Sequence, residues 1–177
     1  FQHLEQCARG GARLLMLCTP HNPVGRVWSL EELNQILDIC RRYDVTIFSD
    51  DIHCDLVYPG YKHTMLGSLA QPGDKIITAI APNKTFNIPG LGLSALVIPD
   101  KSQREAMKRA FEKLHVGNYN PFSITAYEAA YRDGDEWLDA LMAYLESSRD
   151  AAAEFIAREI PAIRLAKPEA TYLLWLD

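Results

Sequence analysis

The chain has 177 residues, 48% of them hydrophobic and 23% charged, which suits one globular domain or one domain and part of another. Its net charge is −5 and its lysines and arginines are scattered, so we expect no nucleic-acid partner. It has no membrane-length apolar run, no signal-peptide pattern and no regular spacing of its four cysteines; we therefore expect a cytoplasmic protein with free thiols and no membrane partner.

The predicted elements begin with a buried strand over residues 14–18, an apolar run that leads into a loop containing two prolines. A helix is expected over 29–43. Its start is indicated by Ser29 and Glu32, which have the spacing of a capping box, and apolar residues recur behind them at helical intervals. A second apolar strand follows over 45–48. The chain therefore opens with strand and helix in alternation.

Two more apolar strands are expected further along, over 75–81 and 93–98. Continuous apolar strands that alternate with helices are typical of a parallel or mixed sheet that is covered on both faces. The sequence therefore predicts the α/β class, with a mainly parallel sheet flanked by helices.

Helices dominate the next part of the chain. We expect one over 101–115, one that begins near Pro121 and a long one over 135–159, with the last two separated by the break at Asp133-Gly134. The apolar side chains of the long helix recur at helical spacing and are expected to face inward. These side chains are Trp137, Leu138, Leu141, Leu145, Phe155 and Ile156.

After this helix the pattern changes to two short strands, 162–165 and 171–176, which we interpret as a hairpin in a second domain. We therefore expect part of a large domain over 1–145. The end of the long helix and the start of a smaller α+β C-terminal domain are expected over 146–177. Because the chain opens without a methionine and closes inside a strand, we expect a fragment of a longer chain that lacks both ends.

Three polar segments each follow a predicted strand at its carboxyl end. They are 21–26 (HNPVGR), 49–53 (SDDIH) and 81–87 (APNKTFN). In open α/β sheets the carboxyl edge is where ligands bind. We therefore expect these three segments to meet and to form the functional site.

The order of these segments is Asn-Pro-x-Gly, then Asp-x-x-His, then a strand followed by Asn-Lys. This order resembles the fold-type I pyridoxal-5′-phosphate (PLP) enzymes of the aminotransferase class I/II superfamily, and it spans residues 18–94. The longer strings look most like the C–S β-lyases related to cystathionine β-lyase of the MalY/PatB type. These strings are CTPHNPVGRVW, SDDIHCDLVYPGYKHT, APNKTFNIPGLGLS and PFSITAYEAAYRDGDEWLDALMAYL. The resemblance implies PLP as cofactor and the large domain of a PLP-dependent transferase as fold.

The resemblance also implies roles for individual residues. Lys84 is the residue that carries PLP through a Schiff base, and Asp50 is the carboxylate that keeps the pyridine nitrogen protonated. Asn22 is similar to the residue whose amide donates a hydrogen bond to the phenolic oxygen of PLP. His53 stands where transaminases of this fold usually have tyrosine, as expected in the lyase group.

Each of these residues, taken alone, has an ordinary structural explanation. An aspartate such as Asp50 is common in turns or at helix caps, and Asn22 before proline is typical of a turn. Lys84 alone suits a solvated surface, and His53 a packed core. Asp51 is the weaker candidate for the pyridine nitrogen, because neighbours on an extended chain point in opposite directions.

The phosphate site is where the sequence departs from the family pattern. The family often has serine three residues before the lysine and arginine eight after it, and this chain has Ala81 and Gly92 there. Asn83 and Thr85 are the donors that remain nearby. We also expect a glycine-rich helix start outside this sequence to bind phosphate.

Two other groups of residues contain residue types that are common at sites. His53, Cys54, Asp55 and His63 are metal-binding residue types, but alternation along an extended chain separates His53 from Cys54, so we expect no metal. The loop over 117–121 is a candidate for the mouth of the active site or for a dimer interface.

The function implied by the resemblance is β-elimination on cystathionine or a similar cysteine thioether, which yields a thiol, pyruvate and ammonia. An aminotransferase is the nearest alternative, because it shares every step up to removal of the Cα proton. A regulatory module that binds PLP without catalysis is the alternative from another class. Active sites of this fold are usually shared across a homodimer, so we expect one.

Overall fold

The computed structural model describes residues 1–117 and 120–177. Its elements in chain order are α1 (Gln2–Arg9), β1 (Leu14–Cys18), α2 (Leu30–Arg42), β2 (Thr46–Asp50), the 3-10 helix η1 (Leu66–Leu69), β3 (Ile76–Ile80), β4 (Ala95–Val97), α3 (Lys101–Lys113), α4 (Pro121–Asp133), α5 (Asp135–Glu159), β5 (Leu165–Ala166) and β6 (Trp175–Leu176). The predicted strands and helices of the first 160 residues are confirmed to within a few residues, whereas α1 and η1 were not predicted.

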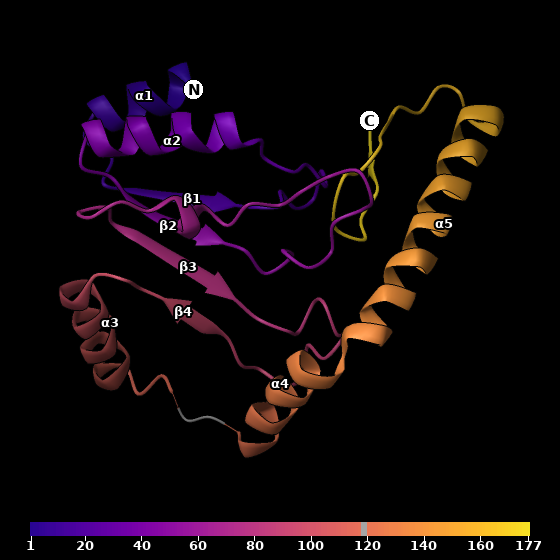
Figure 1. Cartoon of the computed structure of the whole chain (residues 1–177). Coiled ribbons are helices and arrows are strands. Elements are labelled where there is room, and N and C mark those ends of the chain that lie inside the picture. Colours follow the sequence, from indigo (N-terminus) through magenta and orange to yellow (C-terminus); the bar gives the residue numbers. More distant parts are fainter. Residues whose placement is uncertain (118–119) are drawn as a thin grey trace.

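The main sheet has the order β1-β2-β3-β4, with β1, β2 and β3 parallel and the short β4 antiparallel to β3. In the register of the parallel strands, Cys18 lies beside Asp50, and Asp50 beside Ala79. The carboxyl ends of the three strands therefore lie level at one edge of the sheet (Figure 1). This arrangement confirms the predicted fold class and positions the three polar segments.

Helices α1 and α2 lie together over one face of the sheet (Figure 1). The N-terminus of α2 forms the predicted capping box, in which the Ser29 hydroxyl accepts from the Glu32 amide and the Glu32 carboxylate accepts from the Ser29 amide. Its apolar face packs on the strands, with Leu33, Leu37 and Ile47 each no more than 1% exposed. Each fully buried side chain of this size contributes about 1.5–3 kcal/mol, so this layer is the main source of stability.

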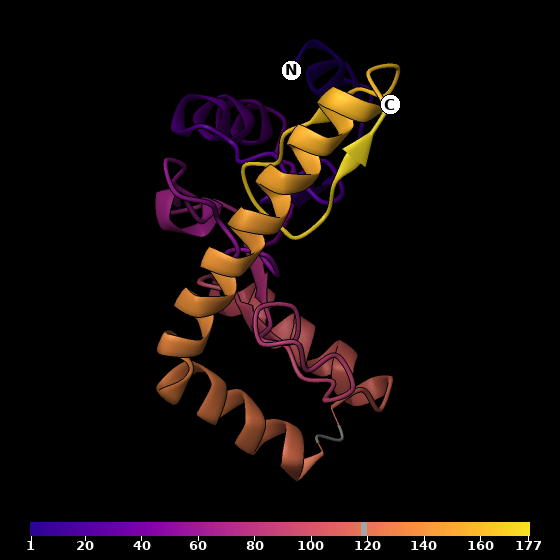
Figure 2. The same cartoon turned by 90° about the vertical axis from the view of Figure 1, so that its right-hand side faces the viewer.

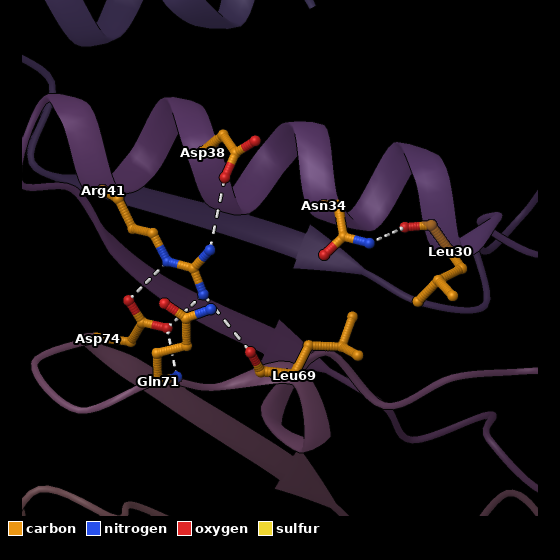
Figure 3. Close-up of polar contacts among 7 residues, drawn as sticks. All are labelled: Leu30, Asn34, Asp38, Arg41, Leu69, Gln71 and Asp74. Atoms are coloured by element: carbon orange, nitrogen blue, oxygen red, sulfur yellow. Dashed lines mark hydrogen bonds and ion pairs between the residues drawn. The ribbon is translucent and has the colours of Figure 1, made fainter.

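The carboxyl end of α2 is joined to the loop before β3 by a polar cluster (Figure 3). The Arg41 guanidinium donates to both carboxylate oxygens of Asp74, over 2.9 and 2.8 Å, and also to the Leu69 carbonyl. The backbone amide of Gln71 donates to the same carboxylate over 2.7 Å. The hydrogen bonds from Arg41 hold the pKa of Asp74 below its usual range, so the pair stays charged at neutral pH.

Helices α4 and α5 pack less closely than the sequence predicts. Figures 1 and 2 show α5 running past the carboxyl edge of the sheet instead of lying on one of its faces. The prediction that Trp137 and Phe155 face inward is wrong, since they are 46% and 51% exposed. The other apolar residues expected to face inward are partly buried; they are Leu138, Leu141, Leu145 and Ile156. A helix that touches its neighbours along one narrow side can bury only part of its apolar surface.

The C-terminal residues form the predicted hairpin, although its strands are shorter and later than expected. Leu165 pairs with Leu176, and Ala166 with Trp175, in antiparallel register. The segment that connects the two strands packs on the loops that follow β1 and β2.

Two further sequence predictions concern the later part of the chain. The proposed division at residue 145 stays a prediction, and the loop candidate 117–121 includes two residues outside the described ones. None of the helices in the described ranges is long and apolar enough to cross a membrane.

Candidate active site

The candidate site lies at the carboxyl edge of the sheet, where the three polar segments meet. Asp50 is the last residue of β2, Asn22 lies in the loop after β1, and Lys84 lies in the loop after β3. The Asn22 amide donates to Nε2 of His53 over 3.4 Å. Asp50 and Lys84 lie near enough for their charges to act on the His53 imidazole. The structure therefore brings Asn22, Asp50, His53 and Lys84 to the same edge of the sheet, and Asn83, the fifth predicted residue, directly precedes Lys84.

His53 is almost fully buried, with 2% of its surface exposed. Burial lowers its pKa, the positive charge of Lys84 acts in the same direction, and the negative charge of Asp50 opposes both. The imidazole is therefore neutral at pH 7. Its Nδ1 has no hydrogen-bond partner among the described residues. His53 is therefore buried, as a packed core histidine would be, and it also contacts Asn22 of the candidate site.

The two neighbouring aspartates have different surroundings. Asp51 is fully buried and accepts hydrogen bonds from the Ser49 hydroxyl over 2.6 Å and from Nε2 of His63 over 2.8 Å. Asp50 is partly exposed, and one of its oxygens accepts a long bond of 3.3 Å from the Ile52 amide. Asp51 is therefore engaged inside the protein, whereas Asp50 can receive a ligand, as alternation along the strand predicts.

The loop that carries Lys84 is a compact turn. The Phe86 amide donates to the Pro82 carbonyl over 2.8 Å, and the Ile88 amide donates to the Asn83 carbonyl over 3.0 Å. The buried Oδ1 of Asn83 has no partner among the described residues, which leaves this side chain available to a ligand. Such a turn fixes the backbone from which Lys84 projects.

Thr85 has a contact that the sequence did not indicate. It is fully buried, and its hydroxyl donates to Oδ2 of Asp55 over 2.9 Å. A hydroxyl carries one proton, so Thr85 cannot donate to a phosphate group while it makes this bond. Of the two donors proposed from the sequence, Asn83 remains.

Sequence reasoning also missed the C-terminal segment that packs against the site. The amides of Glu169 and Ala170 both donate to the Gly25 carbonyl, over 2.8 and 2.9 Å. A Cβ atom on Gly25 would lie 2.5 Å from Cβ of Pro168, so only glycine allows this approach. The sequence predicts a simple hairpin connection between 162–165 and 171–176, and no local signal distinguishes such a connection from a docking segment.

The docking segment continues along the loop after β2. The Thr171 amide donates to the Leu56 carbonyl over 2.7 Å, and the Glu169 carboxylate accepts from the Val27 amide over 2.8 Å. As a result, the ring of Tyr172 packs edge-on against His53, with 5.8 Å between the ring centroids. The C-terminal hairpin thus forms one wall of the candidate site.

Two of the residues of metal-binding types make hydrogen bonds within the protein. His63 bonds Asp51, and Asp55 accepts from Thr85. Within the ranges that the structure describes, no group of three or more His, Cys, Asp or Glu side chains has the arrangement of a metal site.

The model of the aminotransferase class I and II family matches residues 1–177, which is the full length of the chain. The chain belongs to this family. Among curated relatives, cystathionine β-lyase PatB of Bacillus subtilis is 44% identical over 100% of this chain and 46% of its own length. The chain thus spans about half the length of the curated relatives it matches.

Solved structures of this family have the same fold as the chain. Cystalysin from Treponema denticola, which contains PLP, has a TM-score of 0.95 and 36% identity over 99% of this chain and 45% of its own. A PLP-bound putative aminotransferase from Clostridium difficile has a TM-score of 0.94 and 41% identity over 98% of this chain and 46% of its own. Because similarity extends over the strand-end loops as well as the sheet, these structures are relevant to the site.

Proposed function

We propose that the whole protein is a PLP-dependent C–S β-lyase that cleaves cystathionine or similar cysteine thioethers. The observation that carries this proposal is the meeting of Lys84, Asp50, Asn22 and His53 at the carboxyl edge of the sheet. The similarity to a cystathionine β-lyase and to cystalysin supports the choice of reaction. With cystathionine, the balanced reaction consumes one water and yields homocysteine, pyruvate and ammonia.

The described residues fit PLP. The cofactor needs an amine for covalent attachment, a carboxylate beside its pyridine nitrogen and a donor for its phenolic oxygen. Lys84 supplies the amine, the partly exposed Asp50 supplies the carboxylate, and the Asn22 amide supplies the donor. The side-chain NH2 of Asn83 is the donor that we propose for the phosphate group, and its amide oxygen, which only accepts hydrogen bonds, would face away from that group.

The chain's own residues then have distinct tasks. PLP, when bound, supplies the electron sink that stabilises the negative charge left on the substrate when its Cα proton is removed. The Lys84 amine would accept that proton. The Asp50 carboxylate would orient the pyridine ring, and neutral His53 holds the Asn22 side-chain amide, which would donate to the phenolic oxygen.

An aminotransferase is the second candidate, because one of the structures most similar to this chain is a PLP-bound putative aminotransferase. The two reactions share the removal of the Cα proton by Lys84. They differ in whether the thiolate leaves from Cβ or a proton returns to the cofactor. We favour the lyase because His53 stands where transaminases of this fold usually have tyrosine.

The test is pyruvate release from L-cystathionine by the whole protein with PLP and no keto acid. We expect steady release of pyruvate and thiol in equal amounts. Amino-group transfer only after a keto acid is added would make the protein an aminotransferase. PLP binding without either reaction would favour a regulatory module.

The matched variant is Lys84→Ala. We expect it to lose both the visible absorbance of lysine-bound PLP and all pyruvate release, because Lys84 holds the cofactor and moves the proton. Turnover at the wild-type rate in this variant would remove Lys84 from the mechanism.

We also propose that the whole protein is a cytoplasmic homodimer that completes its sites with the partner subunit. This proposal rests on the resemblance, since the active sites of this fold are usually shared between two subunits. Sedimentation of the whole protein with and without PLP gives the oligomeric state directly.

A further inference from the structure

The hydrogen bond between Thr85 and Asp55 connects two loops of the candidate site. Thr85 follows Lys84 directly, and Asp55 lies on the segment that begins at Asp50 and includes His53. The bond is 2.9 Å long, and Thr85 is fully buried. It therefore joins the loop that carries Lys84 to the loop that follows Asp50 at the end of β2.

The sheet itself does not hold these loops together beyond the strand ends. The hydrogen bond from the Asp51 amide to the Ala79 carbonyl, at 2.9 Å, lies at the very end of the β2–β3 pairing. Lys84 lies five residues beyond that carbonyl along the chain. A reactive group displaced by about 1 Å can lose about 100-fold in rate, so contacts beyond the strand ends decide how well Lys84 is placed.

Asp55 is surrounded by protonated donors. The Tyr131 hydroxyl of α4 lies 3.5 Å from the same carboxylate oxygen that Thr85 uses. Burial, with the charge of Asp55 adding to it, raises the pKa of Tyr131 far above its usual range. Burial and the same charge raise the pKa of the Cys54 thiol to about 12. Both groups therefore keep their protons at neutral pH, and Asp55 is the acceptor at this junction.

Helix α4 supports the Lys84 loop at a second point. The Phe86 ring packs edge-on against the Tyr131 ring, with 5.5 Å between centroids. Thr85 and Phe86, the two residues after Lys84, are thus both held by side chains outside their own loop. This places the restraint directly beside the reactive lysine.

We propose that Asp55 and Thr85 are positioning residues that hold Lys84 at its working distance from Asp50 through their hydrogen bond. The inference rests on the proposed function, because the working distance is that needed to hold PLP. Neither residue touches the reacting atoms: Asp55 acts through Thr85, and Thr85 acts through the backbone of Lys84.

The test compares Thr85→Val with Thr85→Ser in the whole protein. Valine keeps the shape of threonine and removes the hydroxyl, whereas serine keeps the hydroxyl. We expect Thr85→Val to slow covalent attachment of added PLP to the apoprotein by about 10- to 100-fold, measured by visible absorbance. We expect kcat to fall by a similar factor with KM little changed, and Thr85→Ser to remain near wild type.

A second variant tests the same bond from its other end. Asp55→Ala removes the acceptor at a partly exposed position, so it remains informative even if Thr85→Val fails to fold. Because both changes break one bond, the double variant should attach PLP no more slowly than the slower single variant. Fully additive losses would mean that the two residues act separately, and this would overturn the inference.

The outcomes separate the inference from the proposed function. If the wild-type protein attaches no PLP, the proposed function fails and the inference fails with it. If wild type attaches PLP and Thr85→Val attaches it equally fast, only the inference fails. Equal losses in Thr85→Val and Thr85→Ser would also overturn it, because the methyl packing and not the hydroxyl would then be responsible.

Discussion

The first hundred residues and the helices α3 to α5 bury their apolar surfaces to very different extents. All the buried hydrophobic residues of the described chain except Ala170 lie at or before Ile98. Among the described residues of the three later helices, the buried ones are Ser123 and Arg149, and α3 has none. The sheet with α1 and α2 is thus a unit with its own core, and it also presents the three strand ends that form the site.

The later helices contact this unit at its loops. The Phe86 ring packs against both Tyr131 and Trp137, at centroid distances of 5.5 and 5.8 Å. The Arg149 guanidinium lies 4.1 Å from the centre of the Tyr58 ring. The comparison teaches that stability and site geometry have different sources: the core comes from the first part of the chain, whereas the loops at the site are also held by α4 and α5.

The largest effect on the turnover rate is expected from a change at Asp50, which lies at the carboxyl edge of the sheet. Asp50→Ala should leave PLP bound but slow turnover by several orders of magnitude, because the pyridine nitrogen loses its carboxylate partner. Urea unfolding should change little, since Asp50 is partly exposed. Asp38→Ala, on the outer side of α2, is the matched control and should leave pyruvate release unchanged. A normal rate in Asp50→Ala would show that the sheet edge does not provide this contact.

The next effect tests the difference in burial. Leu37 is 1% exposed in the core under α2, so Leu37→Ala should lower the free energy of unfolding by about 2–5 kcal/mol, measured by urea denaturation. Leu114, at the end of α3, is 69% exposed. Leu114→Ala should therefore change the free energy of unfolding by less than about 0.5 kcal/mol. Similar losses in both variants would break the comparison, because α3 would then be as deeply packed as α2.

A smaller effect is expected where α4 meets α5. A Cβ atom on Gly134 would collide with the Phe86 ring and with the Ala130 carbonyl, so Gly134→Ala should cost about 1–3 kcal/mol of unfolding free energy. Gly90, in the Lys84 loop, has open space around it, and Gly90→Ala is the matched control with an expected change within about 0.5 kcal/mol. If Gly134→Ala also slows PLP attachment, the contact between the later helices and the site is confirmed.

Much of the fold could be predicted because its signals are local. A three-residue spacing predicts the capping box at Ser29 and Glu32, and the structure contains both of its hydrogen bonds. The different surroundings of Asp50 and Asp51 follow from alternation along one strand. The predictions for Trp137 and Phe155 failed because helical spacing identifies an apolar face but does not say whether anything covers it.

The sequence by itself determined most of the strands and helices and the fold class, because caps, alternation and apolar runs act within a few residues and can be recognised without a structure. The roles of Lys84, Asp50, Asn22 and His53 came from the resemblance of their segments to a known family, since each residue alone has an ordinary structural explanation. Only the tertiary structure decided which distant side chains meet, such as Thr85 with Asp55 or Tyr172 with His53. Those pairs depend on how loops far apart in the chain cross the same edge of the sheet, and no local preference encodes that crossing.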